Sequence, residues 1–336
     1  MSELVRLPHS LRPVLRHDGV VQLGSPPGRC VEVPDLTPGE YTYLCALAAP
    51  QSQRSHRVAL ERSGLDAAAR DRLVARLREL DAVVDVSDPA HVREMCGARR
   101  DRLRGALHQL LASGATGGWE TIEARDRATV VVDHGPPWAG SEAVGTVAHG
   151  LLERLDREGV GTLVGPAQAP RWWHDLGDVG SPSLADLVLP VFSARTDAVM
   201  LRQLVEVEIP HLPVVVTAGW VSIGPLVLPG QACTECVVRH EVPVEQVVTE
   251  WLGNPHESPQ HLPGPAEGHT PADLLDWAVR WGGRTALWAL DGAAGTGGTA
   301  GTGEQVATRV SVIAHSPMPR VEQFAVHPDC WCARRT

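Results

Sequence analysis

Four cysteines lie in two short clusters that are far apart in the chain. The first cluster is Cys233-x-x-Cys236, and the second is Cys330-x-Cys332 near the C-terminus. Four thiolates form a complete tetrahedral ligand set for zinc, and four protein ligands leave no position open for a substrate. The spacing therefore predicts a structural zinc ion that ties the end of the chain to its centre.

Other interpretations of these cysteines remain open. Cys-x-x-Cys pairs also serve redox chemistry, and the four side chains could be reduced thiols or disulfides. The Cys-x-Cys spacing is tighter than the usual two-residue gap, and His240 or His327 could replace one thiolate. The other cysteines have no ligand spacing, so we expect single buried side chains at Cys30, Cys45 and Cys96.

The composition excludes several classes of function. All 30 basic residues are arginine, against 40 acidic residues, and the net charge is −10. Without lysine there is neither a P-loop lysine nor a Schiff-base nucleophile. The negative charge argues against non-specific nucleic-acid binding. No apolar run reaches the roughly 20 residues of a membrane span, and no secretory signal is recognisable, so we expect a cytoplasmic protein without membrane contact.

Residues 1–90 carry a mixture of short strands and helices. Strands are expected at residues 13–16, 20–23, 31–33 and 82–86. Helices are expected from the N-cap Thr37, at residues 55–62 and at residues 65–80. This order predicts a winged-helix-like domain. Such domains most often bind DNA, but acidic residues interleave with the arginines of the third helix, so the helix has no basic stripe. The alternative use is a peptide clamp, in which an extended peptide adds a strand to the sheet edge.

Residues 91–127 form a charged connector in which one helix is expected. From residue 128 to residue 336, buried strands and helices alternate, which predicts a doubly wound α/β sheet. One or two helices are expected over residues 271–290, because Gly282-Gly283 interrupts the pattern. Two paired strands, at residues 306–313 and 321–326, should then deliver the last cysteine pair.

The α/β part lacks the features of a nucleotide site. After Asp133 the chain reads His-Gly-Pro-Pro-Trp-Ala-Gly, which is not Gly-x-Gly-x-x-Gly, and its two prolines remove backbone donors that would hold phosphate. After the next strand, residues 165–168 offer no carboxylate for a ribose. We therefore expect a degenerate nucleotide site, no catalytic residues and no ATP in this chain.

The whole chain resembles the ThiF-like partner proteins of azoline-forming cyclodehydratases, which act in ribosomal peptide natural-product biosynthesis. The resemblance rests on Gly224-Pro225…Pro229…Cys233-Thr234-Glu235-Cys236, on His327-Pro328-Asp329-Cys330-Trp331-Cys332, and on the winged-helix-like segment before them. It implies that the front domain binds the leader of a precursor peptide as an added strand. It also implies that a YcaO-type partner holds ATP and activates the peptide backbone for cyclisation of Cys, Ser or Thr.

The leading hypothesis is therefore a non-catalytic leader-peptide-binding scaffold that serves a YcaO-type cyclodehydratase and forms a homodimer, as is common for this fold. The peptide would bind between the edge strand and the third helix, at Val31, Glu32, Val33, Arg72, Leu73, Arg76 and Leu77. The ThiF-like fold also resembles ubiquitin-activating-type adenylating enzymes, so the alternative is an ATP-dependent adenylating enzyme. A winged-helix regulator with a metal-sensing domain is a third hypothesis.

Overall fold

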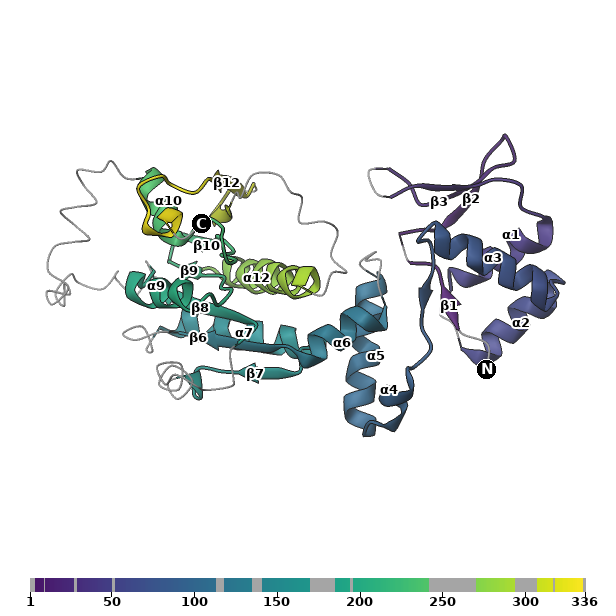
Figure 1. Ribbon diagram of the computed structural model, residues 1–336, viewed down its shortest axis with the longest axis horizontal. Helices are drawn as coiled ribbons and strands as arrows, with labels where there is room; N and C mark the ends of the chain where they lie inside the picture. The colour runs from purple at the N-terminus through teal and green to yellow at the C-terminus, as the bar shows by residue number, and fades with distance from the viewer. Residues whose placement is uncertain are drawn as a thin grey trace, which may run out of the picture. The chain divides into compact units, whose positions relative to one another are not determined.

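The computed structural model describes residues 4–8, 10–26, 29–49, 52–112, 118–134, 141–169, 185–193, 196–241, 270–293, 307–316 and 318–334 (Figure 1). The chain forms two compact units. The first unit comprises Met1–Asp126 with Arg157–Gly159, and the second comprises Arg127–Asp156 with Val160–Thr336. The segment predicted as a connector, residues 91–127, therefore lies almost wholly within the first unit.

The first unit begins with small sheets and three helices. Its strands are β1 (Val5–Arg6), β2 (Pro13–Leu15), β3 (Val21–Leu23), β4 (Val31–Val33) and β5 (Val84–Asp85). Strands β2, β3 and β4 form an antiparallel sheet with β3 in the middle, and β1 pairs with β5. The helices are α1 (Pro38–Leu47), α2 (Gln53–Ser63) and α3 (Ala67–Glu79). These positions confirm the predicted strands and helices of this segment.

Local sequence signals explain where these helices begin and end. Thr37 and Glu40 form a reciprocal capping box at the start of α1. Ser52 caps α2, which ends at Gly64 with a φ of 66°, a left-handed conformation that glycine adopts without strain. Asp66 accepts a hydrogen bond from the Ala69 N–H at the start of α3. The helices then bury apolar side chains against the sheet in one core.

Three further helices complete the first unit: α4 (Ala90–Glu94), α5 (Gly97–Ala112) and α6 (Trp119–Arg127). The sequence predicted only α5. These helices bury leucines with Trp119 and Ile122, and Val84 of β5 joins the same cluster. The buried Arg125 side chain lies 3.6 Å from the Glu158 carboxylate, which explains why Arg157–Gly159 belong to this unit.

The second unit is built on a seven-stranded sheet with the order β12-β11-β10-β9-β8-β6-β7. Four strands run parallel: β6 (Thr129–Asp133), β7 (Thr162–Val164), β8 (Leu187–Ser193) and β9 (Val214–Val216). An antiparallel extension follows: β10 (Trp220–Ile223), β11 (Ala307–Ile313) and β12 (Arg320–Phe324). The predicted strand pair before the last cysteines is confirmed.

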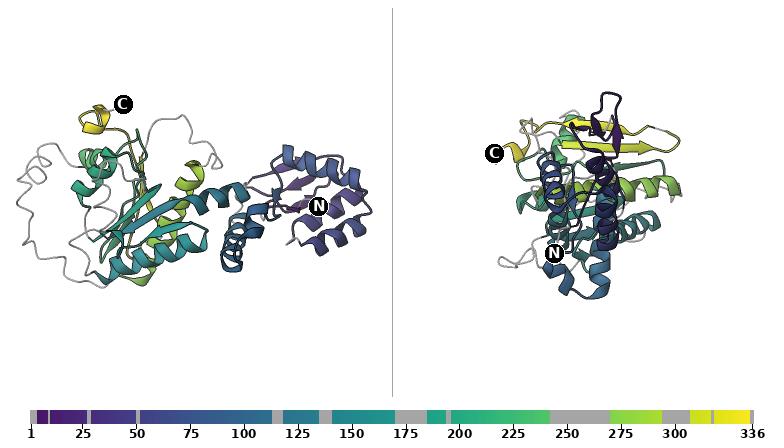
Figure 2. Two further views of the ribbon diagram at one scale, coloured as in Figure 1. Left: turned by 60° about the horizontal axis from the view of Figure 1, so that its bottom comes forward. Right: turned by 90° about the vertical axis from the view of Figure 1, so that its right-hand side faces the viewer.

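Helices cover both faces of this sheet (Figure 2). On one face, α7 (Glu142–Arg157) and α12 (Ala272–Ala293) pack on the valines and leucines of β6, β8 and β9. On the other face lies α9 (Ala198–Glu206), which packs on Val188, Phe192 and Val215. The alternate residues of each central strand are thus buried on opposite sides, as a doubly wound sheet requires.

Of the one or two helices predicted here, α12 is a single helix, and the interruption expected at Gly282-Gly283 is wrong. The glycines allow close packing against α7. A Cβ on Gly283 would lie 2.4 Å from the Arg154 Cδ, and a Cβ on Gly150 of α7 would lie 2.7 Å from a Val279 methyl group. Tertiary contact therefore stabilises the helix where glycine alone would weaken it.

A second prediction is wrong: Cys30, Cys45 and Cys96 are exposed. Cys30 precedes β4, Cys45 lies on the outer face of α1, and Cys96 precedes α5. None of these positions faces a core, so burial does not follow from residue type. Among the described helices, none is long and apolar enough to cross a membrane.

A buried hydrogen bond joins α1 to α2. The Tyr43 hydroxyl lies 2.6 Å from the His56 Nε2, and both side chains are buried. Burial lowers the pKa of His56, and the positive charge of Arg70 lowers it further. Burial also raises the pKa of Tyr43 to about 12. Both shifts favour the neutral pair.

We predict that acid loosens α1 and α2. Below the ordinary histidine pKa of about 6.5 the unfolded chain binds a proton that folded His56 resists, so the free energy of unfolding falls as pH falls. The protection of α1 and α2 against hydrogen–deuterium exchange, taken relative to the intrinsic exchange rate at each pH, should fall between pH 7.5 and 5.5, and less so in a His56→Gln variant. An equal loss of protection in both proteins would contradict this assignment.

Candidate functional site

The second unit brings the two cysteine clusters together at the end of its sheet. Cys233 follows β10 after a turn at Gly230, whose φ of 78° suits glycine, and Cys236 lies in α10 (Thr234–Glu241). Cys330 and Cys332 follow β12, and Cys332 lies in the short 3₁₀ helix η1 (Trp331–Arg334). Because β11 pairs with β10 and β12 with β11, the sheet itself carries the C-terminal pair back to the first.

The four sulfur atoms fit a tetrahedral metal site. The Sγ atoms of Cys233 and Cys236 are 3.8 Å apart, those of Cys233 and Cys330 are 3.6 Å apart, and those of Cys236 and Cys332 are 3.3 Å apart. All four lie within 4.8 Å of one another and are buried. A tetrahedron with Zn–S bonds of about 2.3 Å has sulfur–sulfur distances of about 3.8 Å. The cluster can therefore hold a metal such as zinc.

The electrostatics of the cluster favour a bound cation. Hydrogen bonding to Cys236 and Cys330, together with burial, raises the pKa of Cys233. Burial also raises the pKa of Cys332. Conversely, hydrogen bonds from its neighbours lower the pKa of Cys236, which also accepts the His327 N–H at 3.4 Å. Ligation by all four thiolates therefore needs the positive charge of a metal to displace the thiol protons.

The two histidines considered as substitute ligands make other contacts. The His240 Nε2 lies 3.1 Å from the Ala325 carbonyl oxygen, and the His327 Nδ1 accepts the Asp329 N–H at 3.2 Å. Their rings pack against each other, with centroids 5.0 Å apart. Since four sulfur atoms already complete a ligand set, neither histidine is needed as a ligand.

We predict that Cys330→Ser abolishes metal binding at this cluster. Protein purified without chelator should contain about one tightly held metal ion such as zinc per chain, and the variant should contain almost none. The melting temperature of the variant should also fall, because the C-terminal segment loses its attachment.

Elemental analysis and thermal melts measure both effects. Cys96→Ser is the matched control, since it removes an exposed thiol outside the cluster. Full metal content in the Cys330 variant would show that these sulfur atoms are not the ligands.

The first unit holds the residues predicted to bind peptide, and its sheet has an open edge. On one side of β3, the Gly24 N–H donates to the Arg12 carbonyl oxygen and the Arg16 N–H donates to that of Val20. Residues 20, 22 and 24 therefore direct their backbone groups toward β2. Val21 and Leu23, which lie between them, must direct their backbone groups toward β4.

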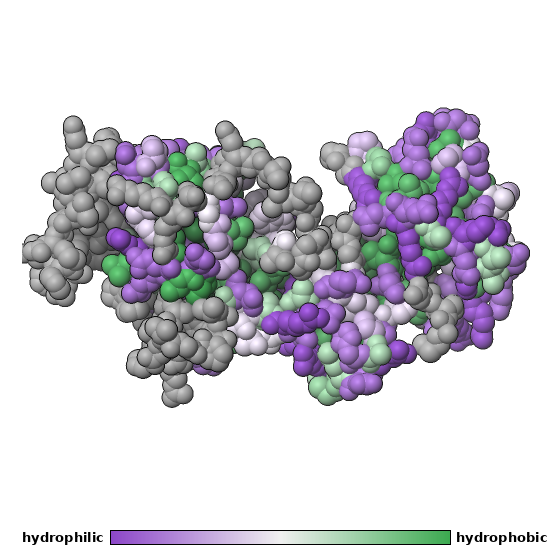
Figure 3. All heavy atoms as spheres, viewed as in Figure 1, coloured by the Kyte–Doolittle hydropathy of each residue, from purple (hydrophilic) through white to green (hydrophobic). Residues whose placement is uncertain are grey.

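Strand β4 consequently has one residue whose backbone N–H and C=O point away from β3. Val21 pairs with Val33 and Leu23 pairs with Val31, so the backbone groups of both valines are used by β3. Glu32 lies between them, and its N–H and C=O point away from β3. Among the described residues, no strand pairs with this side of β4. Figure 3 shows hydrophobic surface beside this small sheet, bordered by hydrophilic side chains.

The predicted peptide-binding side chains fall into two groups. Val33, Leu73 and Leu77 are buried in the core of the first unit. Val31 is half-buried, Glu32 is exposed and forms an ion pair with Arg16, and Arg72 is exposed. The remaining residue, Arg76, is half-buried.

Arg29 connects the two sides of the predicted clamp, and no sequence pattern indicated this role. It lies just before β4 and donates to the Leu80 carbonyl oxygen at 2.6 Å and to the Asp81 carboxylate at 2.9 Å. Both partners follow the last residue of α3. The start of β4 is thereby held beside the end of α3, a contact between segments distant in sequence.

The predicted nucleotide position is described only in part. The glycine- and proline-containing loop, residues 135–140, lies outside the described residues. After β7, the Gln168 Oε1 accepts the Gly165 N–H at 3.0 Å, and the Gln168 N–H donates to the Gly165 carbonyl oxygen. This side chain closes a turn at the position where a dinucleotide-binding fold has its ribose carboxylate.

The fold is shared with solved structures. No family model and no curated protein matches the sequence. A heterocyclase in complex with substrate and cofactor has a TM-score of 0.61 and 13% identity, over 98% of this chain and 39% of that chain. The heterocyclase TruD has a TM-score of 0.60 and 15% identity, over 98% of this chain and 43% of that one. Escherichia coli MccB with succinimide has a TM-score of 0.54 and 14% identity, over 99% of both chains.

The chain thus spans about two fifths of the length of the two heterocyclases and the whole length of MccB. The match runs through both units, and it confirms the ThiF-like α/β fold that the sequence resemblance predicted.

Proposed function

We propose that the protein is a non-catalytic scaffold that binds the leader of a ribosomal precursor peptide and presents it to an ATP-dependent YcaO-type cyclodehydratase for azoline formation. The observation that carries the proposal is the outward-facing backbone of Glu32 on the open edge of β4. An extended peptide pairs with such an edge through main-chain hydrogen bonds, whatever its sequence. The similarity of the whole chain to two heterocyclases supports the same assignment.

In this proposal the first unit is a winged-helix-like clamp. The peptide lies along β4, where Glu32 supplies a donor and an acceptor and half-buried Val31 supplies apolar contact. Leu73 and Leu77 do not contact the peptide in this proposal. They belong to the same core cluster as Val33 and so hold β4 and α3 in place. Arg72 and Arg76 attract acidic leader residues by charge.

The second unit has a supporting role. Zinc bound by Cys233, Cys236, Cys330 and Cys332 would act structurally, because four protein ligands leave no open coordination position. The ion would hold the segment with Cys233 and Cys236 to the C-terminal segment with Cys330 and Cys332. We assign the ATP-dependent step to the partner because this chain has no lysine and carries prolines in place of a glycine-rich loop.

We predict that Glu32→Pro weakens leader binding about tenfold. Proline removes the outward N–H and places its ring at the open edge, while the hydrogen bonds between β3 and β4 remain because they use Val31 and Val33. A lost hydrogen bond is worth roughly 0.5–1.5 kcal/mol, and about 1.4 kcal/mol corresponds to a tenfold change in affinity.

Fluorescence anisotropy measures the affinity for the labelled leader of the precursor encoded beside this gene. Glu32→Ala is the control, because it removes the same side chain and its ion pair with Arg16 but keeps the N–H. If proline and alanine have equal effects, the peptide does not bind as an added strand.

A second candidate function is ATP-dependent adenylation, favoured by the match over the full length of MccB. If the scaffold proposal holds, the purified protein binds no ATP and catalyses no ATP–pyrophosphate exchange with any precursor peptide. Calorimetry with ATP and magnesium, and exchange of labelled pyrophosphate, test this. Peptide-dependent exchange by the protein alone would replace the scaffold proposal with the adenylating enzyme.

A further inference from the structure

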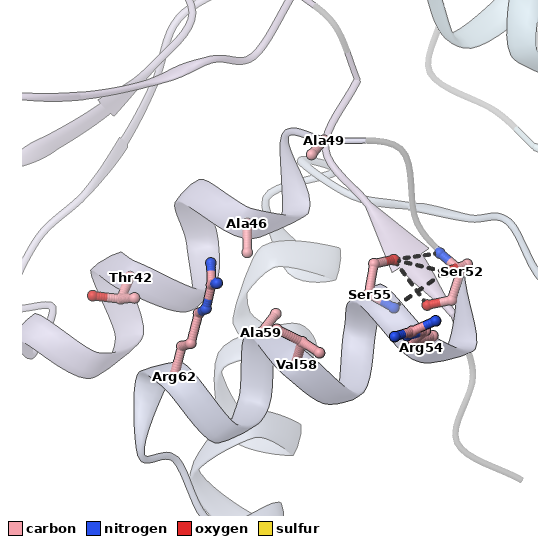
Figure 4. A pocket seen from close by; sticks show the side chains of 9 residues that line it. All are labelled: Thr42, Ala46, Ala49, Ser52, Arg54, Ser55, Val58, Ala59 and Arg62. Atoms are coloured by element: carbon pink, nitrogen blue, oxygen red, sulfur yellow. Dashed lines mark hydrogen bonds between the residues drawn. The ribbon is translucent and has the colours of Figure 1, made fainter.

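A groove lies between helices α1 and α2 of the first unit. None of the residues predicted to bind peptide lines it. Its volume is about 540 Å³, within the size range of ligand-binding pockets. Figure 4 shows its lining, which comes from both helices and their connection. The lining consists of small or apolar side chains in the middle with polar and basic ones at the ends: Thr42, Ala46, Ala49, Ser52, Arg54, Ser55, Val58, Ala59 and Arg62.

The charges of the groove are all of one sign. Its only ionisable lining residues are Arg54 and Arg62, although the whole chain carries a net charge of −10. Both arginines are exposed, and neither makes an ion pair within the described residues. By contrast, Arg57 on the same helix lies outside the lining and pairs with Glu61 at 3.9 Å. The groove therefore suits an anionic ligand.

The hydroxyl groups of the groove are already used within the protein. Ser52 and Ser55 bond to each other and to the backbone at the start of α2. The Thr42 hydroxyl donates to the Pro38 carbonyl oxygen at 2.8 Å. Recognition of an anion at the two ends thus depends on the guanidinium groups.

The spacing of the arginines sets the form of the ligand. Arg54 and Arg62 are eight positions apart on α2, which is about 12 Å along the helix axis. In an extended peptide, side chains four residues apart lie on the same side of the backbone and span about 13 Å. Between the arginines, Ala46 and Ala59 leave room for a peptide backbone to approach closely. The groove thus matches a short extended segment with an acidic residue at each end and small residues between them.

The groove is also close in sequence to the proposed clamp. Only residues 34–37 separate β4 from α1, and Thr42 and Arg62 line the end of the groove nearer the start of α1. A short segment of chain therefore connects β4 to the helix that lines this end of the groove.

We propose that the α1–α2 groove binds an acidic segment of the same precursor peptide that pairs with β4, with two carboxylates four residues apart. The inference rests on the proposed function and extends it with a second point of attachment. The strand pairing is independent of side chains, so the groove supplies sequence selectivity by matching two carboxylates to Arg54 and Arg62.

The test is peptide binding to full-length R54Q/R62Q. Two probes are used: the labelled leader, and the same peptide with every Asp and Glu replaced by Asn and Gln. The arginine variant should bind the native leader about two- to thirtyfold more weakly, as expected for two exposed ion pairs, and its affinity should depend less on salt. The amide peptide should bind both proteins equally. Arg57→Gln is the matched control and should leave both affinities unchanged.

Several results would overturn the inference. These are unchanged binding in R54Q/R62Q, an equal loss in Arg57→Gln, or a leader without two carboxylates at this spacing. If R54Q/R62Q instead weakens binding of the cyclodehydratase alone, the groove serves that partner. The proposed function is judged separately. Loss of binding in Glu32→Pro with no effect of R54Q/R62Q keeps the strand clamp and rejects the groove, whereas no binding of either peptide by the wild-type protein rejects both.

Discussion

The approach of four sulfur atoms to within 4.8 Å constrains the architecture of the second unit. Two of them come from residues after β10 and two from residues after β12, so the antiparallel extension of the sheet must place both segments at the same end. Burial keeps thiols protonated, and several ionised thiolates at this separation repel one another. A bound dication would remove that repulsion and turn the cluster into a crosslink.

Close packing of the helices on one face of this sheet depends on glycine. Helices α7 and α12 approach so closely that a methyl group on Gly150 or Gly283 would collide with the other helix. The central parallel strands β6, β8 and β9 are thereby packed between helices on both faces.

The first unit leaves one sheet edge open. Its sheet of β2, β3 and β4 directs the backbone of Glu32 outward at that edge. The ends of β4 and α3 are held together by Arg29, while α1 and α2 are joined by the neutral Tyr43–His56 pair. An open strand edge and a basic groove are features that a folded domain leaves exposed at some risk of unwanted association. Both become useful if an extended acidic peptide covers them.

Although it did not indicate β1, α4 or α6, the sequence by itself determined most strands and helices, the doubly wound order and the grouping of the four cysteines. These features depend on local periodicity, capping residues such as Thr37 and Asp66, and the spacing of Cys233 with Cys236 and Cys330 with Cys332. Only the tertiary structure decided that α12 continues through Gly282-Gly283, that Cys30 and Cys45 are exposed, and that Leu73 and Leu77 are core residues. It also decided which backbone groups of β4 face outward and that Arg54 and Arg62 flank one groove. The reason is physical: a side chain's burial and partners are set by segments distant in sequence, and no local pattern records them.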